Sequence, residues 1–514
     1  MLIKQLKIFL LFVTGAVAMM SFAATEQSLP DLVQAGKRDV ALELIRVGEN
    51  VNAQQPDGTT ALHWAVYNFD EELTRALLNK EANPNIKNSF GSFPLEEAVK
   101  TANVSLTKML LNAGADPNLS NQDKQTALMI AARIGNLEIV QMLVKRGADV
   151  NAVETWRGQS ALMWAAARNH PDIAKYLIDH GADVNLHADA FDWGSQITSE
   201  PRAQYRPTGG LTPLLYAARG GCLDCVKAIL KTGADINLPD PDGVTALMVA
   251  IDNFNYDVAK YLLSQGANPH VWDWWGRTAL YIAVDMASYN GRGEANKAPS
   301  QEESLDMIRT LLKAGVDPDP QLNMHRPGRG GGNGRFTDDL LNTGATPLLR
   351  AANTFDTESV KLLLEYGADI ELPNAMGVTP LLAASGFGSA RGVLQGNFGP
   401  GAEKHSLATV KVLIAAGANI HARVQDTTSY TARIARRSTM SEREGQSVLH
   451  AAAKQGWVSV FQYLMDQGAD IYVVDNLGQT FMDCAMGEGG GRERRPYESM
   501  VAYLKTIGLD KRKQ

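Results

Sequence analysis

The feature that most constrains this chain of 514 residues is an internal repeat of about 33 residues. The segments "DKQTALMIAA", "DGVTALMVAI" and "TGATPLLRAA" share one pattern, in which a Thr or Ser precedes a short apolar run. This marker position falls at 60, 93, 126, 160, 212, 245, 278, 346, 379, 447 and 480, with Phe in place of Thr or Ser at 93. Such periodicity is typical of solenoids, in which similar units stack on their neighbours and share one continuous core.

Each unit carries the signals of two helices followed by a projecting turn. Thr126 has the character of a helix N-cap, and Leu128 and the small Ala132 are predicted to face inward. A second helix is expected over "LEIVQMLVKR", and Gly147 is expected to end it in the left-handed conformation. The stretch "ADVNAVE" then leads to a β-turn. We call each such connection between one unit and the next a finger.

A second marker, "GAD" or "GAN", follows the second helix in most units, as in "AGADPN", "RGADVN" and "TGADIN". With this marker, the pattern resembles the ankyrin repeat family, whose unit of 33 residues carries T-P-L-H-x-A. The resemblance covers nearly all of residues 28–514. It implies an all-α fold, namely an α-solenoid of about twelve stacked helix-turn-helix repeats with β-turn fingers, over residues 25–514. The degenerate first and last units are expected to be caps.

Insertions interrupt the regular spacing at five places. Three fingers carry 18–19 extra residues, at 189–210, 319–344 and 423–443, and two helix–helix turns are longer, at 288–302 and 386–404. The finger insertions contain Arg but no Lys, and Arg favours bidentate pairing with carboxylate or phosphate and stacking on aromatic rings. Chance composition with pairing inside the chain is the alternative. The candidate partner-binding residues in the insertions are Trp193, Arg202, Arg206, Arg326, Arg329, Arg335, Arg433, Arg436 and Arg437.

The resemblance also implies a recognition surface, because partners of ankyrin-like arrays usually lie in the concave groove formed by first helices and fingers. The groove-facing positions of the first helices are predicted to present Trp64, Trp164, Tyr216 and Arg350. For Trp64 and Trp164 the alternative is that they cover the core between helices. In the fingers we expect Trp156, Trp274 and Trp275 to bind a partner, because two adjacent tryptophans in a turn cannot easily both face the core.

The N-terminus predicts export. Lys4 and Lys7 precede the apolar run "IFLLFVTGAVAMM", which ends at "SFAAT", and this order is typical of a signal peptide over residues 1–24. An uncleaved anchor is the alternative; after cleavage no stable membrane anchor is expected. The periplasm is the first choice of compartment and secretion the second. Only three Cys are present, so packing rather than a disulfide framework is expected to hold the fold.

Few residues suggest chemistry. Cys222 and Cys225 form a C-x-x-C, but alignment with "IGNLEIV" places them at a turn and at a buried position, so we expect packing, with a local disulfide as the main exception. His63 and His450 occupy the family's own His position and are interpreted as structural. The Gly-rich stretch 324–336 lacks the context of a phosphate loop. No catalytic or metal-binding residue and no cofactor is predicted.

These observations predict an exported protein-interaction module that acts as scaffold, accessory factor or inhibitor. The partner would be another protein with an acidic or phosphorylated surface. A nucleic-acid partner is disfavoured by export and by the formal net charge of −7. One alternative is a redox or enzymatic accessory factor that uses Cys222 and Cys225. Another is a structural or adhesion array without a single specific ligand, in which the insertions simply vary.

Overall fold

The computed structural model describes residues 27–192, 207–288, 299–323, 344–387, 401–425, 444–487 and 496–509. The chain divides into two compact units. Unit 1 comprises Met1–Asp189 with Thr212–Ala234, and unit 2 comprises Ala190–Leu211 with Asp235–Gln514. Six helix pairs lie in the described part of each unit, and they confirm the predicted all-α solenoid of about twelve repeats.

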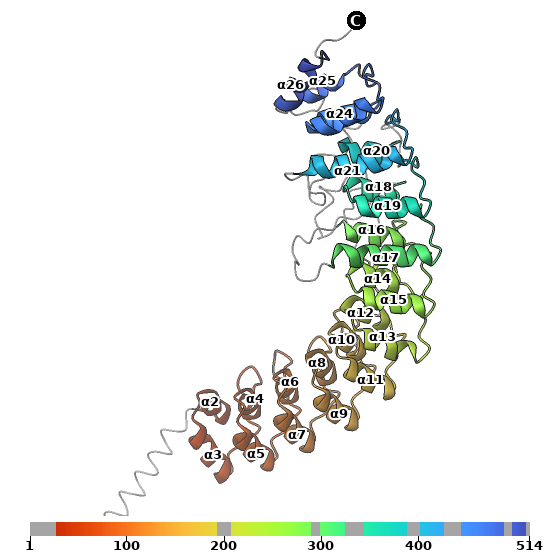
Figure 1. Ribbon diagram of the computed structural model, residues 1–514. Helices are drawn as coiled ribbons and strands as arrows, with labels where there is room; N and C mark the ends of the chain where they lie inside the picture. The colour runs from red at the N-terminus through yellow and green to blue at the C-terminus, as the bar shows by residue number, and fades with distance from the viewer. Residues whose placement is uncertain are drawn as a thin grey trace, which may run out of the picture. The chain divides into compact units, whose positions relative to one another are not determined.

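In unit 1 the first helices of successive repeats form one row and the second helices another (Figure 1). The first helices are α2 (Leu29–Gln34), α4 (Ala61–Tyr67), α6 (Pro94–Lys100), α8 (Ala127–Ile134), α10 (Ala161–Ala167) and α12 (Pro213–Gly220). The second helices are α3 (Arg38–Val47), α5 (Glu71–Asn79), α7 (Val104–Asn112), α9 (Leu137–Lys145), α11 (Pro171–Asp179) and α13 (Leu223–Leu230).

Unit 2 repeats this arrangement with more variation. Its first helices are α14 (Ala246–Asp252), α16 (Ala279–Ala287), α18 (Pro347–Asn353), α20 (Pro380–Leu382), which continues as a π-helical turn over Ala383–Phe387, α23 (Val448–Gln455) and α25 (Phe481–Met486). The second helices are α15 (Tyr256–Ser264), α17 (Gln301–Lys313), α19 (Thr357–Glu365), α21 (Ala402–Ala415), α24 (Val458–Asp466) and α26 (Glu498–Thr506). One short antiparallel ladder joins β1 (Ala190–Asp192) to β2 (Pro207–Gly209).

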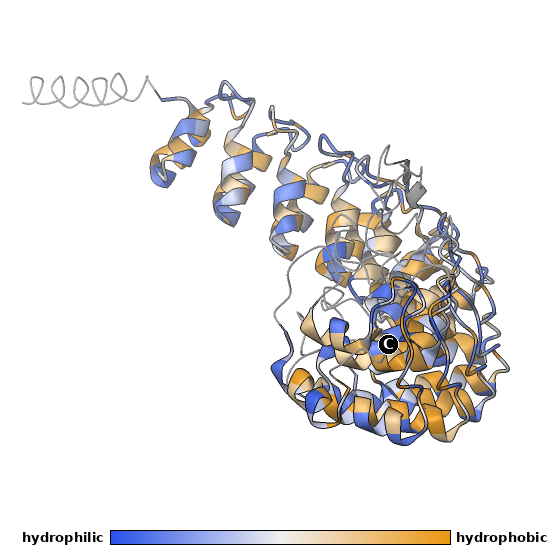
Figure 2. Cartoon of the chain, turned by 90° about the horizontal axis from the view of Figure 1, so that it is seen from above, coloured by the Kyte–Doolittle hydropathy of each residue, from blue (hydrophilic) through white to orange (hydrophobic). Residues whose placement is uncertain are grey.

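The local signals in the sequence act as predicted. The hydroxyl of Thr126 caps α8 by accepting a hydrogen bond from the backbone N–H of Met129 at 3.4 Å. Gly147 follows α9 with a φ of 85°, a conformation that only glycine adopts without strain. The inward faces of α8 and α9 are fully buried, including Leu128 and Ile139. Figure 2 shows hydrophobic colour concentrated on the helices, whereas the fingers are mostly hydrophilic.

Buried histidines tie neighbouring repeats together. The Nδ1 of His63 accepts a hydrogen bond from the backbone N–H of Thr60 at 3.2 Å, and its Nε2 lies 3.2 Å from the carbonyl of Ser92 in the next finger. His450 makes the same pair of contacts with Ser447 and Gln479. The structural interpretation of both histidines is therefore confirmed.

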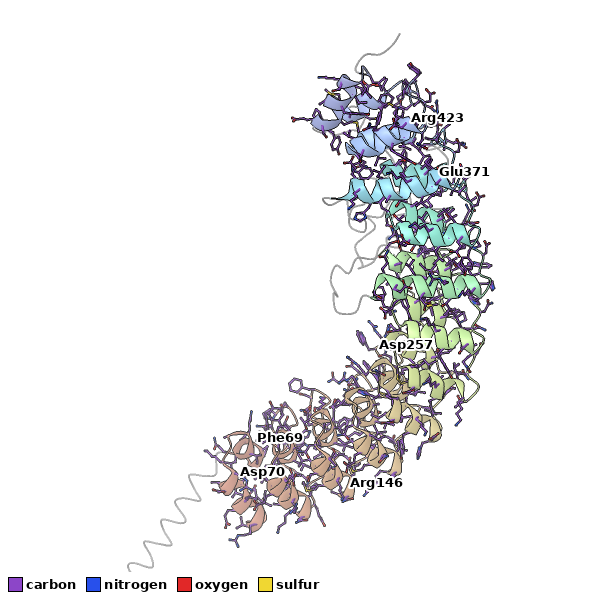
Figure 3. The ribbon with its side chains drawn as sticks, in the orientation of Figure 1. Phe69, Asp70, Arg146, Asp257, Glu371 and Arg423 are labelled. Carbon is purple, nitrogen blue, oxygen red and sulfur yellow. A yellow bond between two sulfur atoms is a disulfide. The ribbon has the colours of Figure 1, made fainter. Side chains whose placement is uncertain are left out.

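The fingers are linked by polar side chains that recur at one position. Asn118 accepts a hydrogen bond from the backbone N–H of Asp149 at 2.7 Å and donates one to the carbonyl of Gly147 at 2.9 Å. Further along unit 2 a carboxylate takes this place: Glu371, labelled in Figure 3, accepts a hydrogen bond from the backbone N–H of Asn419 at 2.6 Å. These contacts hold neighbouring fingers together within each unit.

The predicted signal peptide lies outside the described residues, as do residues 193–206, 324–343 and 426–443 of the finger insertions and residues 289–298 and 388–400 of the longer turns. Within the described ranges, no helix is both long enough and apolar enough to cross a membrane.

Candidate functional site

The finger of unit 2 that precedes α16 is organised by one buried carboxylate. Asp273 is 2% exposed and accepts hydrogen bonds from the backbone N–H groups of Trp275 and Arg277 at 3.0 and 2.8 Å. The Nε of Arg277 donates to it at 2.6 Å. Gly276 closes the turn with a φ of 81°, and a Cβ there would lie 2.7 Å from the backbone nitrogen of Asn323. The turn around Asp273 is therefore fixed on all sides.

This turn decides which way three tryptophans face. Trp275 points inward and is 6% exposed, and the guanidinium of Arg277 lies over its ring at 5.1 Å from the centroid. Trp272 and Trp274, on either side of Asp273, are 64% and 44% exposed. The expectation of an accessible side chain is met for Trp274 and is wrong for Trp275. The backbone N–H of Trp275 is hydrogen-bonded to Asp273, and its ring lies under the guanidinium of Arg277. Trp272 was not predicted, although the alternation of Trp, Asp and Trp around the usual turn carboxylate could have indicated it.

Charges around Arg277 hold this finger against the first helices of unit 2. Burial disfavours the charged guanidinium, yet the attraction of Asp273, Asp252 and Asp285 together raises the pKa of Arg277 above its ordinary value. The Arg277 side chain is mostly buried and stays charged at any physiological pH. The ion pair therefore serves as a permanent support for the exposed Trp272 and Trp274.

A finger of unit 1 uses the same construction. Glu154 is buried and accepts hydrogen bonds from the backbone N–H groups of Trp156 and Gln159 at 2.5 and 3.0 Å. Trp156 stays 63% exposed, and the guanidinium of Arg157 lies over its ring at 4.4 Å. The predicted Trp156 is thus an accessible aromatic side chain on a fixed finger.

On the first helices, the predicted tryptophans are half-buried. The indole N–H of Trp64 donates to the Oε1 of Gln55 at 2.8 Å, and its ring meets Tyr67 edge-on with centroids 5.8 Å apart. Trp164 lies under the guanidinium of Arg133 at 5.4 Å. Both rings therefore cover part of the core and still present an edge to a partner, which combines the two interpretations of the sequence.

Tyr216 and Arg350 do not face solvent, contrary to the expectation for groove positions. Tyr216 is buried because its hydroxyl is hydrogen-bonded to Gln159 and Arg219 lies over its ring at 4.8 Å. Arg350 is buried because its Nε donates to the Oδ1 of Asp285, one repeat earlier, at 2.5 Å. A partner cannot reach either side chain without displacing these contacts.

The remaining predicted site residues lie outside the described residues. They are Trp193, Arg202, Arg206, Arg326, Arg329, Arg335, Arg433, Arg436 and Arg437.

The C-x-x-C motif forms a disulfide. Cys222 is the N-cap of α13, its sulfur accepts the backbone N–H of Cys225 at 3.2 Å, and the two sulfurs are bonded. Both residues are fully buried, whereas the redox alternative requires an accessible thiol pair. The described residues also contain no group of three His, Cys, Asp or Glu side chains arranged to hold a metal ion.

Stacked helix pairs with fixed, aromatic-tipped fingers define a helical repeat protein. Models of the ankyrin repeat family match residues 31–121, 95–188, 198–273 and 214–322 as three-copy arrays, residues 449–492 as a many-copy array and residues 343–375 as a single repeat. These matches cover more than half of the chain, which therefore belongs to the ankyrin repeat family. No curated protein matches the sequence. Ankyrin repeats indicate a protein–protein interaction module.

Proposed function

We propose that this chain is an exported protein that binds one specific protein partner through its fingers and first helices, as a scaffold, accessory factor or inhibitor. The observation that carries the proposal is the pair of exposed tryptophans, Trp272 and Trp274, held outward by the buried Asp273. Large aromatic side chains of this kind supply most of the binding energy in protein interfaces. Fixed anchors also lose little conformational freedom when a partner binds.

Export is supported by two independent features of the chain. The first 24 residues have the order of charged, apolar and small residues found in signal peptides. In addition, Cys222 and Cys225 are joined as a disulfide, and disulfides persist mainly in oxidising compartments such as the bacterial periplasm. The periplasm remains our first choice.

Site-specific photo-crosslinking in cells tests the proposal. A photoreactive amino acid would replace Trp272 or Trp274 in turn, and the control would carry it at the exposed Asp257 on α15, labelled in Figure 3. One dominant crosslinked protein from both finger positions, absent from the control, would support a specific partner. Equal crosslinking from all three positions would favour an array without a specific ligand.

A further inference from the structure

Three neighbouring first helices of unit 1 carry basic residues without acidic ones. Arg133 lies in the last turn of α8, Arg168 is the C-cap of α10, and Arg219 lies in the last turn of α12. The helices and these caps contain no Asp or Glu. We call Arg133, Arg168 and Arg219, with Trp164 and Tyr216, the arginine face.

Close packing brings the members of the arginine face together. A Cβ at Gly220 in α12 would lie 3.0 Å from the carbonyl oxygens of Ala166 and Ala167, so only glycine lets α12 approach α10 this closely. Arg133 reaches from α8 to cover Trp164 of α10, and Arg168 stands one helical turn beyond Trp164 on the same side of the chain. The arginine face therefore spans three successive repeats.

A contact with an aromatic ring prepares Arg133 to bind an anion. The guanidinium carbon of Arg133 lies 5.4 Å from the centroid of the Trp164 ring. The guanidinium N–H donors match the two oxygens of a carboxylate, and a side chain held against a ring has already lost part of its conformational freedom.

Arg133 and Arg168 differ in their ion pairs from Arg277 and Arg350 of unit 2. There, Arg277 is paired with Asp273 at 2.6 Å and Arg350 with Asp285 at 2.5 Å. On α6 of unit 1, Lys100 is paired with Glu96 and Glu97. Neither Arg133 nor Arg168 has a described carboxylate within 4.0 Å. Their charges are left for a group outside the described chain.

We infer that the arginine face binds an acidic segment of a protein partner, with carboxylate side chains on Arg133 and Arg168 and an apolar side chain against Trp164. The inference rests on the proposed function and assigns a chemistry to the partner. A short acidic segment fits better than a nucleic acid, because the net charge of −7 repels a long polyanion beyond the two arginines.

Fluorescence anisotropy with the mature full-length protein tests this assignment. The probe is a short labelled peptide of Glu, Ala and Phe, and the control peptide has Gln in place of every Glu. The Glu peptide is expected to bind at least about tenfold more tightly than the Gln peptide, and to weaken as salt is raised. Equal affinity for the two peptides would overturn the inference, as would tighter binding of a single-stranded oligonucleotide than of the Glu peptide.

Two double variants localise the binding. R133Q/R168Q is expected to weaken binding of the Glu peptide by about tenfold or more. The control K80Q/K108Q removes the same charge from exposed lysines on or next to the second helices α5 and α7, and a change of less than about twofold is expected. Equal losses in both variants would show only a general charge effect and overturn the assignment.

One further variant and the crosslinking result separate structural effects and the two proposals. R133K/R168K keeps the charge without the planar fork, so partial binding is expected if bidentate contacts matter. If the arginine face fails this assay while Trp272 and Trp274 still crosslink one partner, the inference is wrong and the proposed function stands. If the Glu peptide binds to the arginine face but neither finger position crosslinks a partner, the assigned chemistry stands and the role of Trp272 and Trp274 is wrong.

Discussion

Asp273 binds Arg277 through a hydrogen bond of 2.6 Å, and this one pair fixes the finger that carries two exposed tryptophans. The carboxylate also accepts two backbone N–H groups, so it shapes the turn as well as neutralising the guanidinium. The relationship links sequence to function directly. The two residues of the ion pair lie four positions apart; Trp275 between them points inward, and Trp272 and Trp274 remain exposed.

Replacing Asp273 separates these two effects. D273A leaves the mostly buried Arg277 without its nearest carboxylate and is expected to destabilise unit 2 by about 3–5 kcal/mol. D273N is expected to cost less, because the equivalent Asn374 accepts the same two backbone bonds in another finger. Urea unfolding followed by tryptophan fluorescence measures both. A D273A midpoint equal to that of the unchanged protein would contradict the account.

The buried pair of Arg350 and Asp285 is expected to behave as a coupled unit. R350M leaves Asp285 buried without its guanidinium partner, and a loss of about 3–5 kcal/mol in the free energy of unfolding is expected. Replacing both residues, as D285L/R350M, removes the unpaired charge and should recover part of that loss. Additive losses in the double variant, measured by urea unfolding, would show that the two side chains do not stabilise one another.

The two repeat histidines predict a pH dependence of stability near neutrality. Burial lowers the pKa of both His63 and His450 below the ordinary value, so each ring stays neutral in the fold while the unfolded chain takes up a proton. The free energy of unfolding should therefore fall as the pH drops below about 6.5, by up to about 1.4 kcal/mol per pH unit for each histidine.

Urea midpoints between about pH 7.5 and 5 measure this slope, because carboxylates titrate mainly below that window. H63Q/H450Q should be less stable at every pH and should have a flatter slope. An unchanged slope in the double variant would assign the pH dependence to other groups.

The cysteines predict a specific count of reactive thiols. In the native protein none should react, because Cys222 and Cys225 are bonded and Cys484 is buried, with burial raising the pKa of its thiol to about 11. Denaturant alone should expose one thiol, and denaturant with reductant should expose three. A thiol reagent with a chromophore gives these numbers. Three thiols without reductant would contradict the disulfide.

Much of the fold could be predicted from the sequence because each repeat contains its own local signals. Thr126 caps a helix, Gly147 ends the next one, and the period of about 33 residues indicates stacking. These effects depend on residues close together in the chain, so one sequence is sufficient to recognise them.

The site was predicted less well because burial depends on partners from other repeats. Arg350 occupies a groove position by its register, but its ion pair with Asp285, 65 residues earlier, holds its side chain in the core. By its place in the sequence Trp275 is expected to be as exposed as Trp274, but its backbone N–H is hydrogen-bonded to Asp273 and its side chain is buried. Register alone shows which residues share a face, whereas the contacts between repeats decide which of them a partner can reach.

The most direct test of the central claim is the affinity of the partner identified by crosslinking for W272A/W274A, measured by calorimetry. The control is D257A on α15, which removes an exposed side chain outside the finger. The account predicts a loss of at least about 2 kcal/mol, roughly thirtyfold, for the finger variant and almost none for the control. A loss of less than about twofold in the finger variant would show that Trp272 and Trp274 do not anchor the partner.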